Sequence, residues 1–189
     1  MSLVLASSSP RRKKLLEDGG FTFEIEKPSY DERHLRLSPA EIYTMQLALQ
    51  KAMSVKEKRP EDVIVAVDTV VVLDEKILGK PKDRAEAEEM LRAMKGRRHR
   101  VISAYAVLGE EKYVDYDQSF VCFEDFTEAQ MKAYLDKNTY MDKAGAYGVQ
   151  EIDEFEITVE GAMDTVIGMH VASIEARLKG MKGGADRER

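Results

Sequence analysis

Apolar and polar positions alternate along the chain in segments that predict strands and helices in turn. Residues 3–6 are apolar and predict a short buried strand. Residues 10–18 predict a helix, because Pro10 favours the first helical position and Gly19 favours a stop. Residues 63–73 are rich in valine and isoleucine, which predicts a strand buried on both faces.

A longer helix is expected between Ser38 and Pro60, and it begins with the capping-box pattern Ser-Pro-Ala-Glu. Four apolar residues recur at helical spacing and predict its buried face: Ile42, Met45, Leu49 and Met53. Lys51 lies roughly opposite that stripe, so the spacing predicts a solvent-exposed lysine.

The rest of the chain continues the alternation. Asp83 caps a predicted helix at residues 85–94, and Thr127 begins another that runs to about residue 137. Two long antiparallel strands are predicted at residues 99–108 and 112–124. A Gly-rich loop follows at residues 143–150, and a last helix at residues 171–178. This order of elements predicts an α/β fold with a mixed sheet.

The length, net charge and cysteine count of the chain narrow the class of protein. The chain has 189 residues and a net charge of −6, so bulk charge does not favour nucleic-acid binding and we expect no stable nucleic-acid partner. Cys122 is the single cysteine, which excludes an internal disulfide and suits a reducing compartment. The start does not resemble a signal peptide, and Asp68 interrupts the longest apolar run. We therefore expect a cytoplasmic protein with no membrane span.

Two arginines stand where a helix normally disfavours cations. Arg11 and Arg12 fall in the first turn of the predicted helix, where the macrodipole is already positive, and three serine hydroxyls precede them. A bound phosphate would turn this conflict into a complementary site. The alternative is a pair of solvated surface arginines at an ordinary helix start.

Asp68 is an acid inside an apolar strand. Such a carboxylate is costly unless it is paired, hydrogen-bonded or bound to a metal. One interpretation is a strand end or bulge at which Asp68 caps a neighbour. The other, favoured if phosphate binds nearby, is a metal ligand or a general base.

Other candidate residues carry weaker signals. Lys80 stands between Gly and Pro in a segment that a ligand can approach, Glu32 follows Asp31 in a loop, and His99 is expected to be structural. No serine has a histidine and an aspartate as evident partners, which argues against a covalent serine mechanism. Neither a P-loop nor a zinc-binding spacing occurs.

Several segments together resemble the Maf family, the septum-formation-inhibitor-like nucleoside triphosphate pyrophosphatases. They span about residues 3–172 and include LASSSPRRKKLL, LALQKA, AVDTVVVLDEKILGKP, KAGAYGVQ and VEGAMDTVIGMHV. The resemblance implies a fold of the inosine-triphosphate-pyrophosphatase type, with a long mixed sheet, flanking helices and two lobes around a cleft. We expect one catalytic domain at residues 1–179 and a polar tail at 180–189.

The resemblance also implies the chemistry and the roles of residues. It implies hydrolysis between the α and β phosphates of a nucleoside triphosphate, with a divalent metal, Mg²⁺ first and Mn²⁺ or Co²⁺ as alternatives. The phosphate-facing positions correspond to Ser8, Arg11, Arg12, Lys51 and Lys80. Glu32 and Asp68 match the acids around the metal and the water, with Asp68 as the proton acceptor. Lys51 is thereby placed in the cleft, against the expectation from its spacing.

Three positions distinguish the substrate branches of the family. Arg11, Thr69 and Gln150 resemble the branch that acts on dTTP and UTP, rather than the branch for 7-methyl-GTP. Glu151 stands where the family usually has Gly, and the segment at 165–170 also departs from the usual sequence, which we expect to alter packing more than chemistry.

Two alternatives to a pyrimidine-triphosphate enzyme stay open. One is a pyrophosphatase for a modified purine triphosphate. The other is a non-enzymatic nucleotide- or nucleic-acid-binding regulator of cell division, which would depend on the basic run at residues 95–100. For the pyrimidine-triphosphate enzyme, a homodimer is expected.

Overall fold

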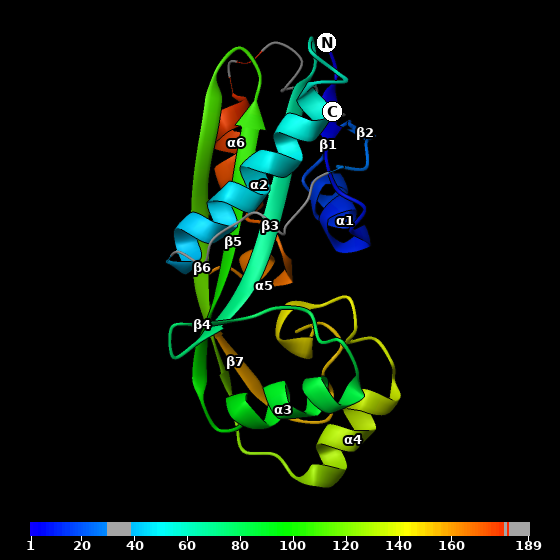
Figure 1. The fold of residues 1–189 in the computed structure, drawn as a ribbon, viewed down its shortest axis with the longest axis vertical. Coiled ribbons are helices and arrows are strands. Elements are labelled where there is room, and N and C mark those ends of the chain that lie inside the picture. The colour runs from blue at the N-terminus through cyan, green and yellow to red at the C-terminus, as the bar shows by residue number, and fades with distance from the viewer. Residues whose placement is uncertain (30–38, 180, 182–189) are drawn as a thin grey trace. The chain divides into compact units, whose positions relative to one another are not determined.

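The computed structural model describes residues 1–29, 39–179 and 181 of the chain (Figure 1). The chain divides into two compact units, and each is described by itself. Unit 1 comprises Met1–Asp68, Ser103–Asp117 and Gly168–Arg189, and unit 2 comprises Thr69–Ile102 and Gln118–Ile167. Among the described residues, no helix has the length and apolar character needed to cross a membrane.

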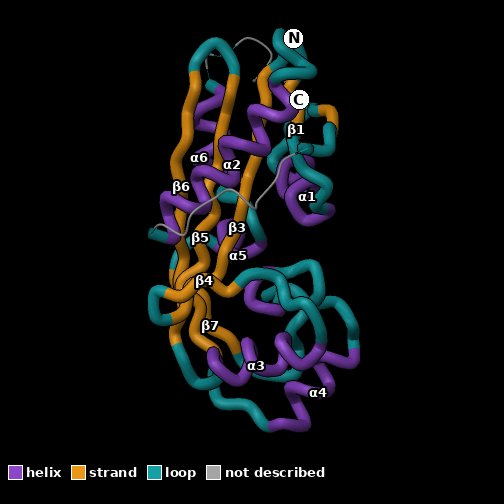
Figure 2. The backbone as a smooth tube through the Cα atoms, viewed as in Figure 1, coloured by secondary structure: helices purple, strands orange, loops and turns teal. Residues whose placement is uncertain are grey.

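The described strands form one mixed sheet (Figure 2). They are β1 (Leu3–Leu5), β2 (Glu24–Ile25), β3 (Val63–Leu73), β4 (Lys76–Leu78), β5 (Arg98–Leu108), β6 (Lys112–Phe123) and β7 (Ile157–Glu160). Their order is β2-β1-β3-β5-β6-β7, with β4 beside β3. β1 is parallel to β2 and β3, whereas β3–β4 and β6–β7 are antiparallel.

The described helices flank this sheet. They are α1 (Pro10–Asp18), α2 (Ala40–Lys56), α3 (Arg84–Met94), α4 (Glu128–Asp136), the short 3-10 helix η2 (Ala144–Ala146), α5 (Met163–Ile167) and α6 (Val171–Leu178). The mixed α/β fold class is confirmed, and the predicted bounds of α1, β3 and α6 agree with the structure. The sequence analysis missed β7 and α5. Ser38, the expected cap of α2, lies outside the described residues.

In unit 1, successive strand residues point to opposite faces of the sheet, and helices cover both faces. On one face, alternate residues of β1, β3 and β5 pack against Ala48, Ala52 and Val55 of α2. On the other face, the intervening residues pack against Leu16 of α1 and Ile174 of α6. This division decides which helix can reach the side chain of each β3 residue.

The predicted buried face of α2 is wrong in part, since Met45 and Leu49 do pack against the core but the other two residues do not. Ile42 and Met53 are 44% and 50% exposed, and the side chains turned to the sheet are mostly small. Alanines also line the facing strands, at positions 6, 66, 104 and 106. Helix and sheet therefore meet largely through small residues, which leaves Ile42 and Met53 outside the contact.

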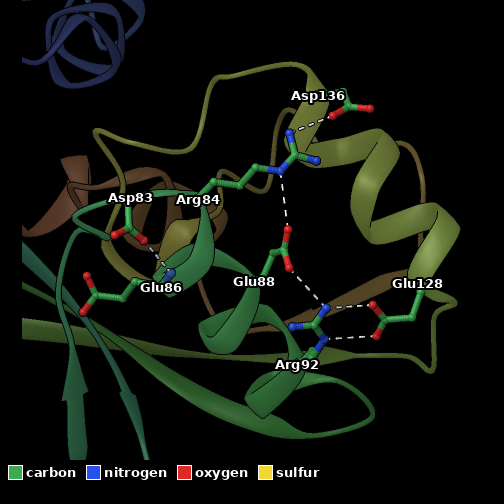
Figure 3. Close-up of polar contacts among 7 residues, drawn as sticks. All are labelled: Asp83, Arg84, Glu86, Glu88, Arg92, Glu128 and Asp136. Atoms are coloured by element: carbon green, nitrogen blue, oxygen red, sulfur yellow. Dashed lines mark hydrogen bonds and ion pairs between the residues drawn. The ribbon is translucent and has the colours of Figure 1, made fainter.

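In unit 2, α3 and α4 lie side by side and are linked by ion pairs at their surface (Figure 3). Arg84 contacts Asp136 at 2.8 Å, and Arg92 contacts Glu128 at 2.8 Å. The predicted caps are confirmed, since Asp83 accepts the amide of Glu86 and Thr127 forms a capping box with Gln130. Because exposed ion pairs stabilise little, the apolar core beneath the helices holds them in place.

Candidate functional site

Asp68 and Lys51 form a buried ion pair in unit 1. Ile64 and Ala66 of β3 face α2, so Asp68, the next alternate residue, is expected to point the same way. Lys51 lies on the buried face of α2, where its Nζ contacts Asp68 Oδ1, and both side chains are only about a tenth exposed. The expectation of an exposed Lys51 is therefore wrong, because it rested on the wrong buried face of α2.

The serine-rich segment follows β1 on the same side of unit 1. β1 pairs in parallel with β3, with Leu5 opposite Val65, and the amide of Ala6 donates to the carbonyl of Val65 at 2.7 Å. The parallel register therefore carries the residues after β1 along β3 in the direction of Asp68. Ser8 in this segment is exposed, which leaves its hydroxyl accessible to a ligand.

The helix that follows begins at Pro10, as predicted, with Ser9 at the N-cap position. The Ser9 side chain makes no capping hydrogen bond, and the first turn contains no acidic residue. Arg11 and Arg12 thus stand at the positive end of a helix with no carboxylate in that turn. An anion at this end would complement the helix macrodipole and the positive charge of the two arginines.

Arg12 is held by the turn that precedes α6. Its Nε donates to the carbonyl of Gly168 at 3.0 Å. Two residues later, His170 Nδ1 lies 3.0 Å from Asp117 Oδ1 on β6, which fixes the turn against the sheet. Asp117 therefore supports the position of Arg12 through the 168–170 turn, and His170, one of the unusual residues of this segment, has a polar role as well as a packing one.

Ser173 has the histidine and aspartate neighbours that the sequence did not reveal. Its hydroxyl donates to Asp117 Oδ1 at 2.9 Å and lies 2.8 Å from His170 Nδ1. A catalytic serine triad uses the two different ring nitrogens of histidine for serine and aspartate. Here both partners meet the same nitrogen, so the group cannot relay a proton and is a structural anchor.

Thr69, Lys80 and Gln150, the remaining described candidates, belong to unit 2. Thr69 follows Asp68 on β3 and is partly buried, whereas Lys80 and Gln150 are exposed. The segments that carry Lys80 and Gln150 are joined, since the amide of Gly145 donates to the carbonyl of Gly79 at 3.0 Å. Gly145 has a positive φ of 67°, and a side chain there would press on Val71 of β3 at 3.0 Å.

His99 lies in the core of unit 2, in keeping with the structural role expected of it. It is 2% exposed, its Nε2 is 2.7 Å from the hydroxyl of Tyr147, and its ring packs edge-on against Phe123. Burial lowers the pKa of His99 to about 4.

A hollow of about 450 Å³ in unit 2 is lined mainly by acids. Its lining residues are Glu124, Asp125, Gln130, Ile152, Asp153, Glu154, Phe155 and Glu156. So many carboxylates would repel a polyanionic ligand. The hollow is therefore a poor candidate for the site that the arginines predict.

The described carboxylates could hold a divalent metal only together with other ligands, such as the phosphates of a substrate. In the parts of the chain that the structure describes, no group of three or more His, Cys, Asp or Glu side chains is arranged to hold a metal ion. Asp68 Oδ1 faces Lys51, which leaves Oδ2 as the oxygen for a metal. Mg²⁺ is often held by one or two carboxylates together with substrate phosphates, so Asp68 fits this mode. Glu32, the other predicted ligand, lies outside the described residues.

These features define an α/β protein with a buried lysine–carboxylate pair and a helix start suited to an anion. Residues 2–181 match the family described as Maf-like protein, and the chain belongs to this Maf family, as its resemblance predicted.

Two relatives cover nearly the whole chain. A protein from Clostridioides difficile (strain 630) named dTTP/UTP pyrophosphatase is 39% identical over 95% of this chain and 94% of its own length. A protein of the same name from Bacillus cytotoxicus is 40% identical over 96% of each chain.

A more distant likeness is a solved structure from Mycobacterium abscessus described as nucleoside-triphosphatase / dITP/XTP pyrophosphatase. It aligns with 65% of this chain and 74% of its own at 18% identity and a TM-score of 0.43, too low to carry an argument.

Proposed function

We propose that this protein is a nucleoside triphosphate pyrophosphatase that hydrolyses dTTP and UTP to the monophosphate and pyrophosphate. The observation that carries the proposal is the buried Lys51–Asp68 pair in the same unit as the arginines of α1. The names of the two relatives, which match over at least 95% of this chain, support the choice of substrates.

The cations bind the phosphates. A triphosphate carries about four negative charges near neutral pH, and an attacking water must approach phosphorus through them. Arg11 and Arg12 offset part of this charge at the start of α1, where the helix amides assist them. Ser8, Lys51 and Lys80 are proposed as the further phosphate ligands. Lys51 is already turned toward Asp68, so it can bridge the acid and the substrate.

Asp68 acts as the proton acceptor. It takes a proton from the attacking water as the anhydride bond between the α and β phosphates breaks and pyrophosphate leaves. The apolar strand on both sides of Asp68 limits the water around it, and Lys51 balances its charge until substrate binds. No covalent intermediate is required.

A divalent metal is proposed on Asp68 and Glu32, with Mg²⁺ first and Mn²⁺ or Co²⁺ as alternatives. When bound, it would neutralise phosphate charge and lower the pKa of a coordinated water. Asp68 Oδ2 is the described atom that suits it, and Oδ1, which Lys51 contacts until substrate binds, is the oxygen that would accept the proton.

Gln150 is proposed to select the base, with Arg11 and Thr69 as the other specificity positions. Uracil and thymine present carbonyl acceptors beside an N–H donor, and an amide can both donate to and accept from such an edge. The exposed position of Gln150 supports this role. Pyrimidine triphosphates are therefore favoured over 7-methyl-GTP.

The regulator alternative loses the feature on which it rested. The basic run at residues 95–100 faces acids of unit 2, since Arg97 contacts Asp74 at 2.7 Å and Arg98 contacts Glu160 at 2.7 Å. Lys95 and Arg100 likewise face Asp125 and Glu75. A run whose charge is neutralised in this way is a poor surface for nucleic acid.

We also propose a cytoplasmic homodimer, supported by the single cysteine and by the exposed apolar residues Ile42 and Met53 on α2. Analytical ultracentrifugation tests the dimer.

A panel of nucleoside triphosphates with Mg²⁺, monitored for pyrophosphate, tests the function. The proposal expects dTTP and UTP to be the best substrates. A preference for 7-methyl-GTP would move the protein to the purine alternative, and binding of nucleotide without turnover would favour the regulator.

A further inference from the structure

Gln150 stands on a tight turn that is closed by its neighbour. The amide of Glu151 donates to the carbonyl of Gly148 at 2.8 Å, so residues 148–151 form a turn with Gln150 at its third position. Gln150 is exposed on this turn, whereas Glu151 is partly buried. The orientation of Gln150 therefore depends on what holds the two ends of the turn.

Lys143 lies directly against the first end. Its side chain is only 5% exposed, and a Cβ atom added to Gly148 would meet Lys143 Cε at 2.7 Å. The backbone of Gly148 therefore rests on the stem of the lysine, and a larger residue there would displace the lysine side chain.

Oxygen atoms surround the ammonium group of Lys143. Its Nζ donates to the carbonyl of Thr139 and lies 2.9 Å from Asp142 Oδ1 and 3.1 Å from Glu151 Oε2. The contact with Glu151 is a charge contact rather than an aligned hydrogen bond, because no hydrogen-bond geometry connects the two groups. Glu151 thus supplies a partly buried counter-charge from the second end of the turn.

Lys137 holds the backbone of Glu151. Lys137, just after α4, donates from Nζ to the carbonyl of Glu151 at 2.9 Å and contacts Glu154 at 2.7 Å. Glu151 is therefore held through its side chain by Lys143 and through its carbonyl by Lys137, and the turn is fixed at both ends.

We propose that the Lys143–Glu151 ion pair sets the orientation of Gln150, so that Glu151 is a positioning residue for discrimination between pyrimidine and purine triphosphates. The inference rests on the proposed function, in which Gln150 contacts the base. Since Glu151 replaces a residue without a side chain in the family pattern, this ion pair is a feature of this chain rather than a requirement of the chemistry.

The test compares kcat and KM for dTTP and dGTP, two nucleotides that share a sugar and differ in the base. Glu151→Gln keeps the size of the side chain and removes its charge. We expect the dTTP:dGTP ratio of kcat/KM to fall about tenfold, through KM for dTTP, while kcat changes less than about twofold. Glu156→Gln, the same change at an exposed acid of the neighbouring segment, should leave the ratio unchanged.

A double variant separates positioning from a general loss of stability. In a Gln150→Ala background, Glu151→Gln should cause no further loss of the ratio, because its effect passes through Gln150. Three results would overturn the inference. The dTTP:dGTP ratio could stay unchanged in Glu151→Gln, kcat/KM could fall equally for both nucleotides, or the losses of the ratio could be additive in the double variant. If Glu151→Gln does not fold, Glu151→Asp, which keeps the charge but shortens the side chain and so weakens its contact with Lys143, gives the same readout. If the parent hydrolyses neither nucleotide, the proposed function fails and the inference with it.

Discussion

Among the described residues, a buried lysine paired with a carboxylate occurs in each unit, and the two pairs differ in the elements that carry them. Lys51 and Asp68 come from a helix and a strand and meet on one face of the sheet, and both side chains are about a tenth exposed. Lys143 and Glu151 come from a single loop, and the Glu151 side chain is 32% exposed. The rigid pair suits chemistry at a fixed point, and the loop pair suits control of the shape of a turn.

The comparison separates two uses of a buried charge. A carboxylate on a strand is positioned by the sheet itself, so its ammonium partner can be shared with a substrate without loss of position. A carboxylate on a loop is positioned by its partner, so the loop loses its shape when the pair is broken. The variants described next test this difference between the two pairs.

Asp68→Asn should give the largest effect. We expect kcat for dTTP to fall about 10²- to 10⁴-fold with the fold retained, because the general base is lost while the size of the side chain is kept. Pyrophosphate release measures the rate, and circular dichroism checks the fold. Asp62→Asn is the matched control, since Asp62 is also held by a cation of unit 1, Arg59, at 2.6 Å. Turnover at the parent rate in Asp68→Asn would remove Asp68 from the mechanism.

Replacement of Lys51 or Lys143 by methionine tests how much each ion pair contributes to the free energy of unfolding. Lys51→Met leaves a nearly buried carboxylate without its ammonium, which costs about 3–5 kcal/mol when a buried pair is broken. Lys143→Met should cost less, because the Glu151 side chain is 32% exposed. Urea denaturation measures the free energy of unfolding. In the Lys51→Met background, Asp68→Asn should recover part of the loss, because the uncompensated charge is removed. Equal stability of parent and single variants would show that these contacts contribute nothing.

His99 predicts how the stability of unit 2 depends on pH. Its pKa is lowered to about 4 by burial, against about 6.5 in the unfolded chain, so the unfolded state binds the proton more readily. The stabilisation from neutral His99 is complete above pH 6.5 and is lost as the pH falls toward 4, by about 3 kcal/mol at most.

His99→Gln isolates this contribution. The difference in unfolding free energy between parent and variant should narrow between pH 7 and pH 4. A difference that stays constant over this range would show that His99 is not held neutral.

The sequence predicted the strand elements well, and it missed the face of α2 for a physical reason. The run at residues 63–73 and the acid inside it were evident, because apolar strand residues and a lone carboxylate are local signals. The burial of Lys51 was not, because the contact surface of α2 consists of alanines, which hydrophobic periodicity scores weakly. The spacing of Ala48, Lys51 and Ala52 on one side of the helix was the signal that could have indicated the burial of Lys51.

The polar contacts that hold the turns in place could not be predicted from the sequence either. Asp117, His170 and Ser173 meet only because β6 passes beside the start of α6, at a separation of more than 50 residues. The Lys143–Glu151 contact is closer in sequence, yet it depends on a turn that brings Gly148 onto the lysine. The Maf resemblance indicated the candidate site residues, and the geometry adds what holds Arg12 and the turn that carries Gln150.

Arg12→Ala tests the proposed phosphate-binding role of the start of α1. We expect affinity for a non-hydrolysable dTTP analogue to fall about ten- to a hundredfold, the range for a lost charge-assisted hydrogen bond, with little change for thymidine. Calorimetry measures both ligands. Lys13→Ala, in which an exposed cation of the same helix is removed, is the control. The same analogue affinity in Arg12→Ala and the parent would exclude Arg12 as a phosphate ligand.

Gln150→Glu tests the base-reading end in unit 2. A carboxylate only accepts hydrogen bonds, so one carbonyl of uracil or thymine would lose its donor at a cost of about 1–3 kcal/mol, or roughly ten- to a hundredfold in kcat/KM. Guanine, which offers two donors, should suffer less. The measurement is kcat/KM for dTTP, UTP, CTP and 7-methyl-GTP. An unchanged ranking would mean that Gln150 does not contact the base.

The central claim is that Asp68 supports cleavage between the α and β phosphates. The most direct test is to identify the products of dTTP hydrolysis by phosphorus NMR, for the parent and for Asp68→Asn. The account predicts equal amounts of dTMP and pyrophosphate from the parent, no orthophosphate, and product formation at least about a hundredfold slower from the variant. Formation of dTDP and orthophosphate by the parent, or of dTMP and pyrophosphate at the parent rate by the variant, would contradict it.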